Sequence, residues 1–221
     1  MADRARGIPV AKEGIPFITL GSLLTLGCWM AEWVWLTWLL GSLTLFTAWF
    51  FRNPARTIPQ GRSLIVSPGD GTVVAVEQEF EYRFLKEPSV RISIFLNVFN
   101  VHINRIPVAG IVQDVVYTPG QFMAANRPKA SADNEQNALM LRRSDGKKIL
   151  CVQIAGLIAR RIVCWVVPGE QVETGERFGL IRFGSRMDVY LPLDSAIQVK
   201  VGAKVKGGSS ILAELLCVEH S

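Results

Sequence analysis

The 221-residue sequence is poor in the side chains on which many catalytic and metal sites depend. It has two histidines, His102 and His220, so a metal site built from histidines alone is excluded, and imidazole catalysis must use one of these two. The four cysteines lack Cys-x-x-Cys spacing and stand in apolar surroundings. They are Cys28, Cys151, Cys164 and Cys217. This pattern favours buried free thiols in a reducing cytosol over disulfides or a metal site.

The sequence also lacks the marks of nucleic-acid binding. Its formal net charge is +5, but the basic residues are scattered and are not interleaved with aromatic residues as in a nucleic-acid groove. No metal or nucleotide motif is present. The positive charge suits an anionic membrane surface, and 49% of the residues are hydrophobic. We therefore expect part of the chain to lie in lipid and expect no nucleic-acid partner.

An almost uninterrupted apolar stretch runs from Ile15 to Phe51, with Glu32 near its middle. As one helix it would reach about 55 Å, far more than the roughly 30 Å of a bilayer core. Two helices, about Pro16–Met30 and Trp33–Phe51, fit better. Four tryptophans lie near the expected turn, where an interfacial aromatic belt would lie: Trp29, Trp33, Trp35 and Trp38. The stretch predicts a transmembrane helical hairpin.

Basic residues flank both outer ends of this stretch, Lys12 before it and Arg52 and Arg56 after it. The positive-inside rule then places both ends, and the body that follows, on the cytoplasmic side of the cell membrane. A cleaved signal peptide is disfavoured by the length and by the absence of a short apolar region with a cleavage site. A hairpin that only dips into the bilayer remains open.

The rest of the chain predicts a mostly β domain, because short β-type runs alternate with Gly/Pro turns. The expected strands are Leu64–Ser67, Gly71–Gln78, Val90–Val101, Gly110–Tyr117, Ala138–Arg143, Lys148–Ala155 and Ile162–Val167. Asn126–Gln136 is polar and predicts a loop. We divide the chain into a basic segment (1–14), a membrane-anchoring hairpin (15–51), a connector (52–63) and a β domain (64–221).

An internal echo lies near the C-terminus. The pattern Gly-x-x-Val-x-x-Gly-x-x-apolar occurs at Gly169–Phe178 and again at Gly202–Ile211. Such a pattern suits a tight corner between strands and resembles the corners of lipoyl- and biotinyl-type β-sandwiches, the barrel-sandwich or hammerhead folds. Two similar turns arising by chance are the alternative.

Three places could carry chemistry. His102 ends a long β-type run and, by alternation, shares an inward face with Ile92, Ile94, Leu96 and Val98, so it is either a hydrogen-bonded structural histidine or a base. Asp70 stands in the turn Ser67–Thr72, where an aspartate either bonds locally or orients a histidine. The pair Gly184-Ser185 is an ordinary turn unless the rest of the chain makes its bond reactive.

Five motifs resemble those of phosphatidylserine decarboxylase proenzymes, in particular the short form typical of archaea and many bacteria. They are Phe51-Arg-Asn-Pro-x-Arg-x-Ile-Pro59, Ser67-Pro-Gly-Asp-Gly-Thr72, Phe99-Asn-Val-His-Ile-Asn-Arg-Ile-Pro107, Lys129-Ala-Ser-x-x-Asn-Glu-x-Asn137 and Phe183-Gly-Ser-Arg-Met-Asp-Val-Tyr-Leu-Pro192. They occur in the family's order and cover the chain from about Phe51 to Leu215.

The resemblance implies a zymogen that makes its own pyruvoyl cofactor by cutting itself between Gly184 and Ser185. Ser185 would attack the preceding carbonyl, and elimination from the resulting ester would leave a pyruvoyl group on an α chain, separate from a β chain of residues 1–184. The family's Asp-His-Ser set falls on Asp70, His102 and Ser185. The pyruvoyl group would form a Schiff base with phosphatidylserine and yield phosphatidylethanolamine and CO2 in phospholipid biosynthesis. The resemblance implies no metal.

One position departs from the family's longer bacterial members, which carry two histidines three residues apart. Here His102 matches the first and Arg105 stands at the second. His102 would then serve both self-cleavage and turnover, with His220 as the other imidazole in the chain.

Two further interpretations remain beside this one. A pyruvoyl decarboxylase acting on a soluble amino acid is disfavoured by the hairpin and the motif order. A membrane-tethered lipoyl- or biotinyl-like carrier or scaffold fits the glycine echo, but no convincing lysine tip for such a modification is present. The sequence leaves the acyl-chain preference and the oligomeric state open, a homo-oligomer included.

Overall fold

The computed structural model describes residues 9–121, 134–156, 161–181 and 184–216. The chain divides into two compact units, Met1–Ala55 and Arg56–Ser221.

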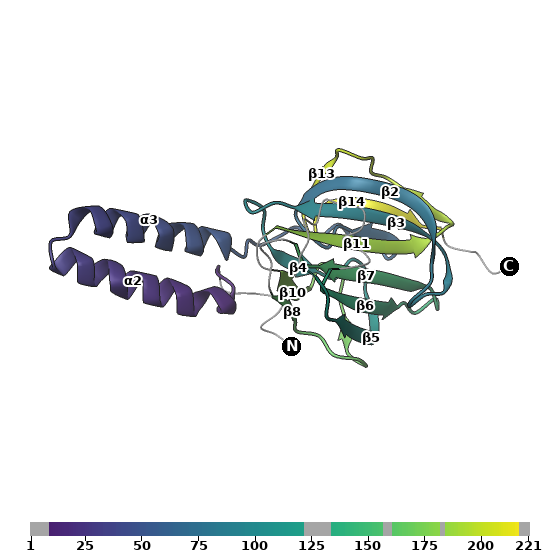
Figure 1. Ribbon diagram of the computed structural model, residues 1–221. Helices are drawn as coiled ribbons and strands as arrows, with labels where there is room; N and C mark the ends of the chain where they lie inside the picture. The colour runs from purple at the N-terminus through teal and green to yellow at the C-terminus, as the bar shows by residue number, and fades with distance from the viewer. Residues whose placement is uncertain (1–8, 122–133, 157–160, 182–183, 217–221) are drawn as a thin grey trace. The chain divides into compact units, whose positions relative to one another are not determined.

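The first unit is a helical hairpin (Figure 1). A short 3-10 turn, η1 (Lys12–Gly14), leads into α2 (Ile15–Met30), and α3 (Val34–Phe50) returns beside it. The turn between the helices contains Glu32, whose φ of 59° lies in the left-handed region. Both expected helices are confirmed to within one residue at each end. The base of the hairpin is closed by a hydrogen bond from Ala11 N to Phe51 O (2.8 Å).

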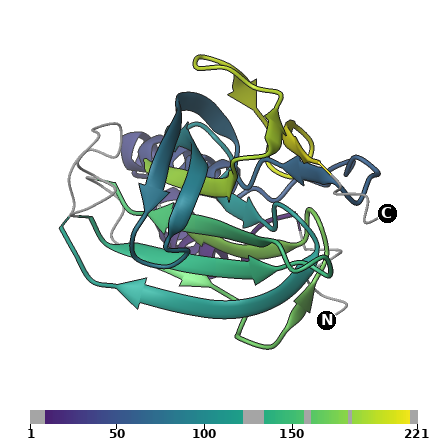
Figure 2. The ribbon, with the colours of Figure 1, turned by 90° about the vertical axis from the view of Figure 1, so that its right-hand side faces the viewer.

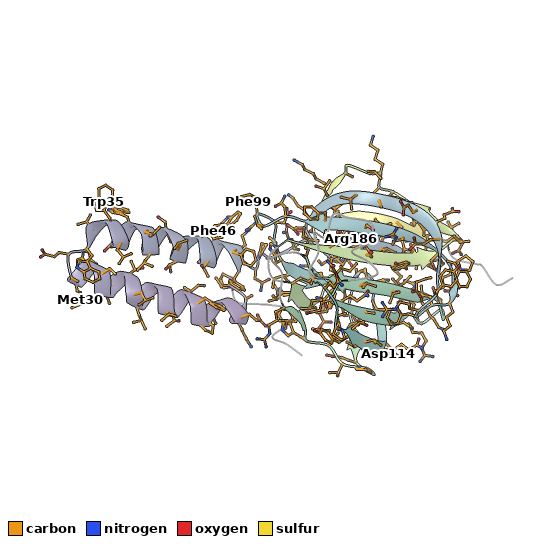
Figure 3. The ribbon with its side chains drawn as sticks, in the orientation of Figure 1. Met30, Trp35, Phe46, Phe99, Asp114 and Arg186 are labelled. Atoms are coloured by element: carbon orange, nitrogen blue, oxygen red, sulfur yellow. The ribbon has the colours of Figure 1, made fainter. Side chains whose placement is uncertain are left out.

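The apolar side chains of this hairpin are largely exposed. No residue of α2 is buried, and Trp35 of α3 is 90% exposed. Figure 3 shows Met30 and Trp35 beside the turn that joins the helices. By length and composition, one stretch, Lys12–Met30, is sufficient to cross a membrane, whereas Val34–Phe50 is shorter. The helices of the predicted hairpin are therefore present, and its membrane crossing stays a prediction.

The second unit is mostly β. Its strands are β1 (Leu64–Val66), β2 (Gly71–Glu81), β3 (Glu87–Leu96), β4 (Ile103–Arg105), β5 (Gly110–Thr118), β6 (Gln136–Arg142), β7 (Lys148–Ile154), β8 (Ile162–Cys164), β9 (Gln171–Val172), β10 (Arg177–Ile181), β11 (Ser185–Pro192), β12 (Ser195–Ile197), β13 (Lys204–Val205) and β14 (Ile211–Leu215). In the described part of the chain they form one eight-stranded sheet, in the order β13-β2-β3-β11-β7-β6-β5-β9, and two three-stranded sheets, β1-β14-β12 and β4-β10-β8. Figures 1 and 2 show the large sheet curling into a half-barrel.

The strands of this unit fall into two halves with matching connections. The order of the large sheet is symmetric about the β11-β7 pair, so that β2 corresponds to β5 and β3 to β6. The small sheets correspond likewise, with β1 matching β4 and β14 matching β10. Even the irregularities agree, because the register shift between Val73 and Ala75 recurs between Val112 and Asp114. An approximate two-fold correspondence therefore relates the halves.

The two glycine corners are a part of this correspondence. All four corner glycines lie in the left-handed region, at φ 86° for Gly169, 77° for Gly175, 90° for Gly202 and 77° for Gly208. The first glycine of each corner donates its N–H to the matching valine carbonyl at 2.8 Å, Gly169 to Val112 and Gly202 to Val73. The echo in the sequence thus marks two equivalent corners, and the chance explanation is wrong.

The hydrophobic core lies on the inner face of the large sheet and beneath the small sheets. Its largest cluster includes Ile65, Ile94, Phe178 and Met187, each fully buried. A second, smaller cluster lies around Leu150 and faces the other way. Alternation along β11 explains the division, because Met187, Val189 and Leu191 face the main core while Tyr190 packs with the second cluster.

The strand expected at Ile162–Val167 ends at Cys164, and a longer strand prediction is also wrong at its end. The run expected to continue from Val90 to Val101 stops at Leu96. Two asparagine side chains end it, because Asn100 Oδ1 accepts from Asn97 N and Asn97 Oδ1 accepts from Phe99 N, both at 2.9 Å. His102 therefore follows a turn and does not continue the inward face of that strand.

Two other expectations have mixed outcomes. Cys151 is buried, Cys28 and Cys164 are half-buried, and all three are free thiols. Cys217 lies outside the described residues. Most of the loop expected at Asn126–Gln136 also lies outside them, and its end is wrong because Gln136 begins β6.

Candidate functional site

Ser185 is the first residue of β11 and is completely buried. Gly184 before it has a φ of 51°, in the left-handed region where glycine is favoured. Ser185 pairs in register with Leu96 at the end of β3. Its hydroxyl oxygen has no hydrogen-bond partner among the described residues. A buried hydroxyl without a partner is unfavourable for stability, so this position calls for a functional explanation.

His102 is also buried, with 3% of its surface exposed. Its ring nitrogen Nδ1 lies 2.9 Å from the carbonyl oxygen of Asn100. A carbonyl can only accept, so Nδ1 donates when the ring is neutral, and Nε2 is then the nitrogen able to take up a proton. The backbone carbonyl of His102 accepts from Ile181 N at 3.3 Å, which ties the histidine to the strand that leads towards Gly184.

Asp70 stands in a tight turn in which Ser67 Oγ donates to Gly69 O at 2.6 Å. Its carboxylate accepts from Arg56 at Oδ2 (2.6 Å) and from Gly207 N at Oδ1 (2.8 Å). Among the described residues, its hydrogen bonds therefore go to an arginine and to the second glycine corner, not to His102. These two bonds hold Asp70 in its turn.

These three segments nevertheless meet at one end of the β3-β11 pair. A Cβ added to Gly69 would lie 3.1 Å from a methyl carbon of Leu96 and 3.5 Å from Met187 Cγ, so the turn of Asp70 rests on the strands that carry Ser185. Arg105 N donates to Pro68 O at 2.8 Å, which joins the same turn to the segment after His102. The structure thus brings Asp70, His102 and Ser185 into one neighbourhood, without a direct hydrogen bond between their side chains.

Arg105, which the resemblance matches to the second histidine of the longer bacterial enzymes, is buried and donates to Gly175 O at 2.9 Å. Burial lowers its pKa to about 10, helped by the positive charges of Arg177 and Arg56 and opposed by Asp70. The guanidinium is therefore still charged at neutral pH and cannot act as the base that a histidine would provide. Reasoning from the sequence did not identify this arginine cluster, although Arg56 belongs to one of the five motifs.

A second charged group lies on the opposite face of β11. Arg186 pairs with Asp188 at 2.9 Å and 3.0 Å, and both side chains are buried (Figure 3 labels Arg186). Arg91 lies 3.7 Å from Asp188 and 3.0 Å from Glu79. The group also raises the pKa of Tyr190, through burial first and then the charges of Asp188 and Glu79. These ion pairs anchor the strand that begins at Ser185.

A small cavity of about 40 Å³ opens on the same face as these ion pairs. Asp188, Glu81 and Tyr190 are among the residues that line it. Since one water molecule in the liquid has a share of about 30 Å³, such a space suits water and not a lipid head group.

Some predicted site residues cannot be placed. His220, Phe183 and the first five residues of the motif Lys129–Asn137 lie outside the described residues. Within the described part of the chain, no group of three His, Cys, Asp or Glu side chains could hold a metal ion.

The comparisons with known proteins are consistent in what they identify. The family described as phosphatidylserine decarboxylase matches residues 43–213. A phosphatidylserine decarboxylase proenzyme of Syntrophus aciditrophicus is 53% identical over 204 residues, which cover 92% of this chain and 96% of the relative. Proenzymes with the same name from Desulfotalea psychrophila and Ralstonia nicotianae are 46% and 49% identical, with coverage of 95% and 93% of this chain and 98% and 95% of the relatives.

Proposed function

Because this chain belongs to the phosphatidylserine decarboxylase family, we propose that it is a self-processing proenzyme that cuts its own bond between Gly184 and Ser185. The mature enzyme converts phosphatidylserine to phosphatidylethanolamine and CO2. The observation that carries the cleavage site is the completely buried Ser185 hydroxyl, which has no partner among the described residues and follows a glycine in the left-handed region.

The self-cleavage uses atoms of the chain and one water molecule. Ser185 Oγ attacks the carbonyl carbon of Gly184, its proton passes to a base, and the amide nitrogen leaves with a proton, so that an ester replaces the peptide bond. Loss of the Cα proton of residue 185 then breaks the Oγ–Cβ bond and releases Gly184 as a carboxylate. Water hydrolyses the remaining dehydroalanine end to a pyruvoyl group and ammonia.

We assign the base to His102. Its Nδ1 is held by the carbonyl of Asn100, which leaves Nε2 as the nitrogen that can accept the Ser185 proton. Arg105 is cationic and cannot share this task, so one imidazole serves both self-cleavage and the protonation step of turnover. Asp70 is assigned as a positioning residue, because its bonds to Arg56 and Gly207 hold the turn that packs on Leu96 and Met187.

The residues at the site fit a pyruvoyl group generated in place. Residue 185 is enclosed at a strand end, beside apolar Leu96 and Met187 and close to the segment of His102. The group supplies a carbonyl system that takes up the electron pair left behind when CO2 departs. After cleavage β11 remains paired with β3 and β7, so the α chain (from residue 185) and the β chain (1–184) stay together.

We further propose that the hairpin anchors the enzyme in the cell membrane, with the catalytic unit on the cytoplasmic side. Its exposed apolar helices and the flanking basic residues support this placement. Acyl chains hold a substrate in the bilayer by about 0.8 kcal/mol per methylene, so an anchored enzyme meets the head group at the surface. The domain limits (1–14, 15–51, 52–63 and 64–221) are part of this proposal.

We also assign the β unit to the barrel-sandwich or hammerhead type, on the support of its two equivalent glycine corners. The same corners also suit a lipoyl- or biotinyl-like carrier, but that alternative is not favoured by the family of the relatives.

Intact-mass spectrometry of the purified full chain tests the proposal. We expect two fragments that separate between residues 184 and 185, with a pyruvoyl mass on the smaller one, and a single uncut chain without decarboxylation in Ser185→Ala. Ser209→Ala is the matched control, because Ser209 also follows a left-handed glycine, Gly208. We expect this variant to cleave normally. A wild-type enzyme that decarboxylates phosphatidylserine as one intact chain would refute the proposal. Normal cleavage in His102→Ala would remove the assignment of the base.

A further inference from the structure

Three buried amide side chains form a hydrogen-bonded chain with one direction. Asn137 Nδ2 donates to Gln153 Oε1 at 3.0 Å, and Gln153 Nε2 donates to Asn104 Oδ1 at 2.8 Å. The exposed fractions of Asn137, Gln153 and Asn104 are 3%, 0% and 0%. The last donor of the chain, Asn104 Nδ2, has no hydrogen-bond partner among the described residues.

The fold does not require these amides, because the other half of the same unit has apolar residues in their places. Asn137 on β6 pairs in register with Gln153 on β7. In the other half, Val90 on β3 and Leu191 on β11 form the corresponding pair. Asn104 on β4 corresponds to Ile65 on β1, since each lies beside the register shift of its small sheet. Val90, Leu191 and Ile65 are all buried.

The contrast between the halves has an energetic consequence. An apolar trio satisfies this part of the fold without any hydrogen bond, whereas a buried amide donor left without a partner is unfavourable for stability. Each hydrogen bond in such a chain polarises the next, so the terminal amide is a stronger donor. A donor of this kind, left without a partner, suits an acceptor that forms only during a reaction.

The chain of amides reaches the strand that begins at Ser185. Gln153 is the register partner of Met187, so it shares the inner face of the large sheet with Met187 and with Ser185 two residues earlier. Asn104 comes two residues after His102, whose carbonyl binds Ile181 N on the strand before Gly184. Asn104 Nδ2 and Ser185 Oγ are two of the buried groups that lack a partner among the described residues, and Gln153, which binds Asn104 and pairs with Met187, lies between their segments.

We propose that Asn104 donates this hydrogen bond to the carbonyl oxygen of Gly184 as Ser185 attacks it, with Gln153 and Asn137 as positioning residues. The proposal rests on the proposed self-cleavage. When the Oγ–C bond forms, the carbonyl electron pair moves onto oxygen, and a preorganised N–H stabilises that charge. The donor is oriented because its own oxygen is held by Gln153, which is held in turn by Asn137.

The test follows the cleavage of freshly refolded full-length chain over time by intact-mass spectrometry. The key variant is Asn104→Leu/Gln153→Leu/Asn137→Val, which replaces all three amides by apolar residues, as in the other half. We expect its cleavage to slow by about 100–1,000-fold, the usual effect of losing one such donor. In a Ser185→Ala background, we expect its thermal midpoint to equal or exceed that of the parent, because no buried polar group is lost without replacement.

Asn104→Asp is an isosteric second variant that keeps the acceptor for Gln153 but removes the donor. It tests the loss of the donor even if the apolar variant fails to pack. Slow cleavage in a variant with an unchanged thermal midpoint supports the proposal. Cleavage within about threefold of wild type in either folded variant overturns it. Wild-type chain that stays intact in the same experiment defeats the proposed self-cleavage itself, so the two failures are distinguishable.

Discussion

The ion pair between Asp70 and Arg56 should be a main support of the site, and Asp70→Asn tests it. The amide keeps an oxygen for Gly207 N but removes the charge that faces Arg56 at 2.6 Å and that also acts on the nearby Arg105. Removing one partner of a buried ion pair is unfavourable by about 3–5 kcal/mol. Both side chains here are 14% exposed, and one hydrogen bond survives. We therefore expect a loss of about 2–3 kcal/mol in the free energy of unfolding.

The measurement is thermal unfolding in detergent, followed by circular dichroism in a Ser185→Ala background, so that all variants remain one chain. For a unit of this size, about 2–3 kcal/mol corresponds to a fall in Tm of roughly 4–12 °C. Arg56→Met and the double variant complete a cycle whose coupling energy should be about 2 kcal/mol. In a chain that retains Ser185, we also expect Asp70→Asn to slow self-cleavage, because the turn that rests on Leu96 loosens.

Asp194→Asn is the matched control, because Asp194 pairs with Lys147 at 2.7 Å but is 43% exposed. Pairs of this kind contribute about 0.2–1 kcal/mol, so its Tm should hardly change. If Asp70→Asn melts within about 1 °C of the parent, or if the cycle shows no coupling, the role given to Asp70 is refuted.

Two further outcomes follow from the packing around β7 and β10. A Cβ at Gly179 would lie 2.2 Å from Val163 O and 3.0 Å from Gln153 Nε2. Gly179→Ala should therefore disturb both the β10-β8 pairing and the amide chain, and we expect a lower Tm and slower cleavage. A variant with wild-type values for both would contradict the structure. Burial, and then the charges of Asp188 and Cys164, raise the pKa of the Cys151 thiol from 9.0, so the thiol stays protonated in the native state and stability declines as the pH rises above the unfolded-state value. Iodoacetamide at pH 8 should therefore leave Cys151 unmodified until the protein unfolds, as peptide mass mapping would show, and rapid native labelling would contradict this.

Much of the architecture was predictable from local patterns. The hairpin helices and most strands lie within a few residues of the expected ranges, because continuous apolar stretches and β-type runs between Gly/Pro turns depend on residues near in sequence. The end of β3 was missed because Asn97 and Asn100 form a side-chain turn within an otherwise β-type run. Alternation alone could not show that turn, although the expected burial of His102 is confirmed.

The partners of the candidate site residues were less predictable. Arg105 could be identified as a departure at a histidine position, but its bond to Gly175 spans 70 residues. Nothing local to Asn104 indicates that its oxygen binds Gln153, 49 residues away. Partners of this kind are selected by which strands adjoin in the folded sheets, and a single sequence does not state that order.

The sequence by itself determined that Gly184-Ser185 is the bond to examine, because the last of five ordered motifs contains it. It also determined the two glycine corners, since only residues tolerant of left-handed angles fit them. The tertiary structure decided that Asp70 holds Arg56 and Gly207, and that one half of a two-fold unit is polar where the other is apolar. The physical reason is that burial and hydrogen-bond partners depend on contacts between distant strands, whereas backbone conformation and apolar periodicity are local.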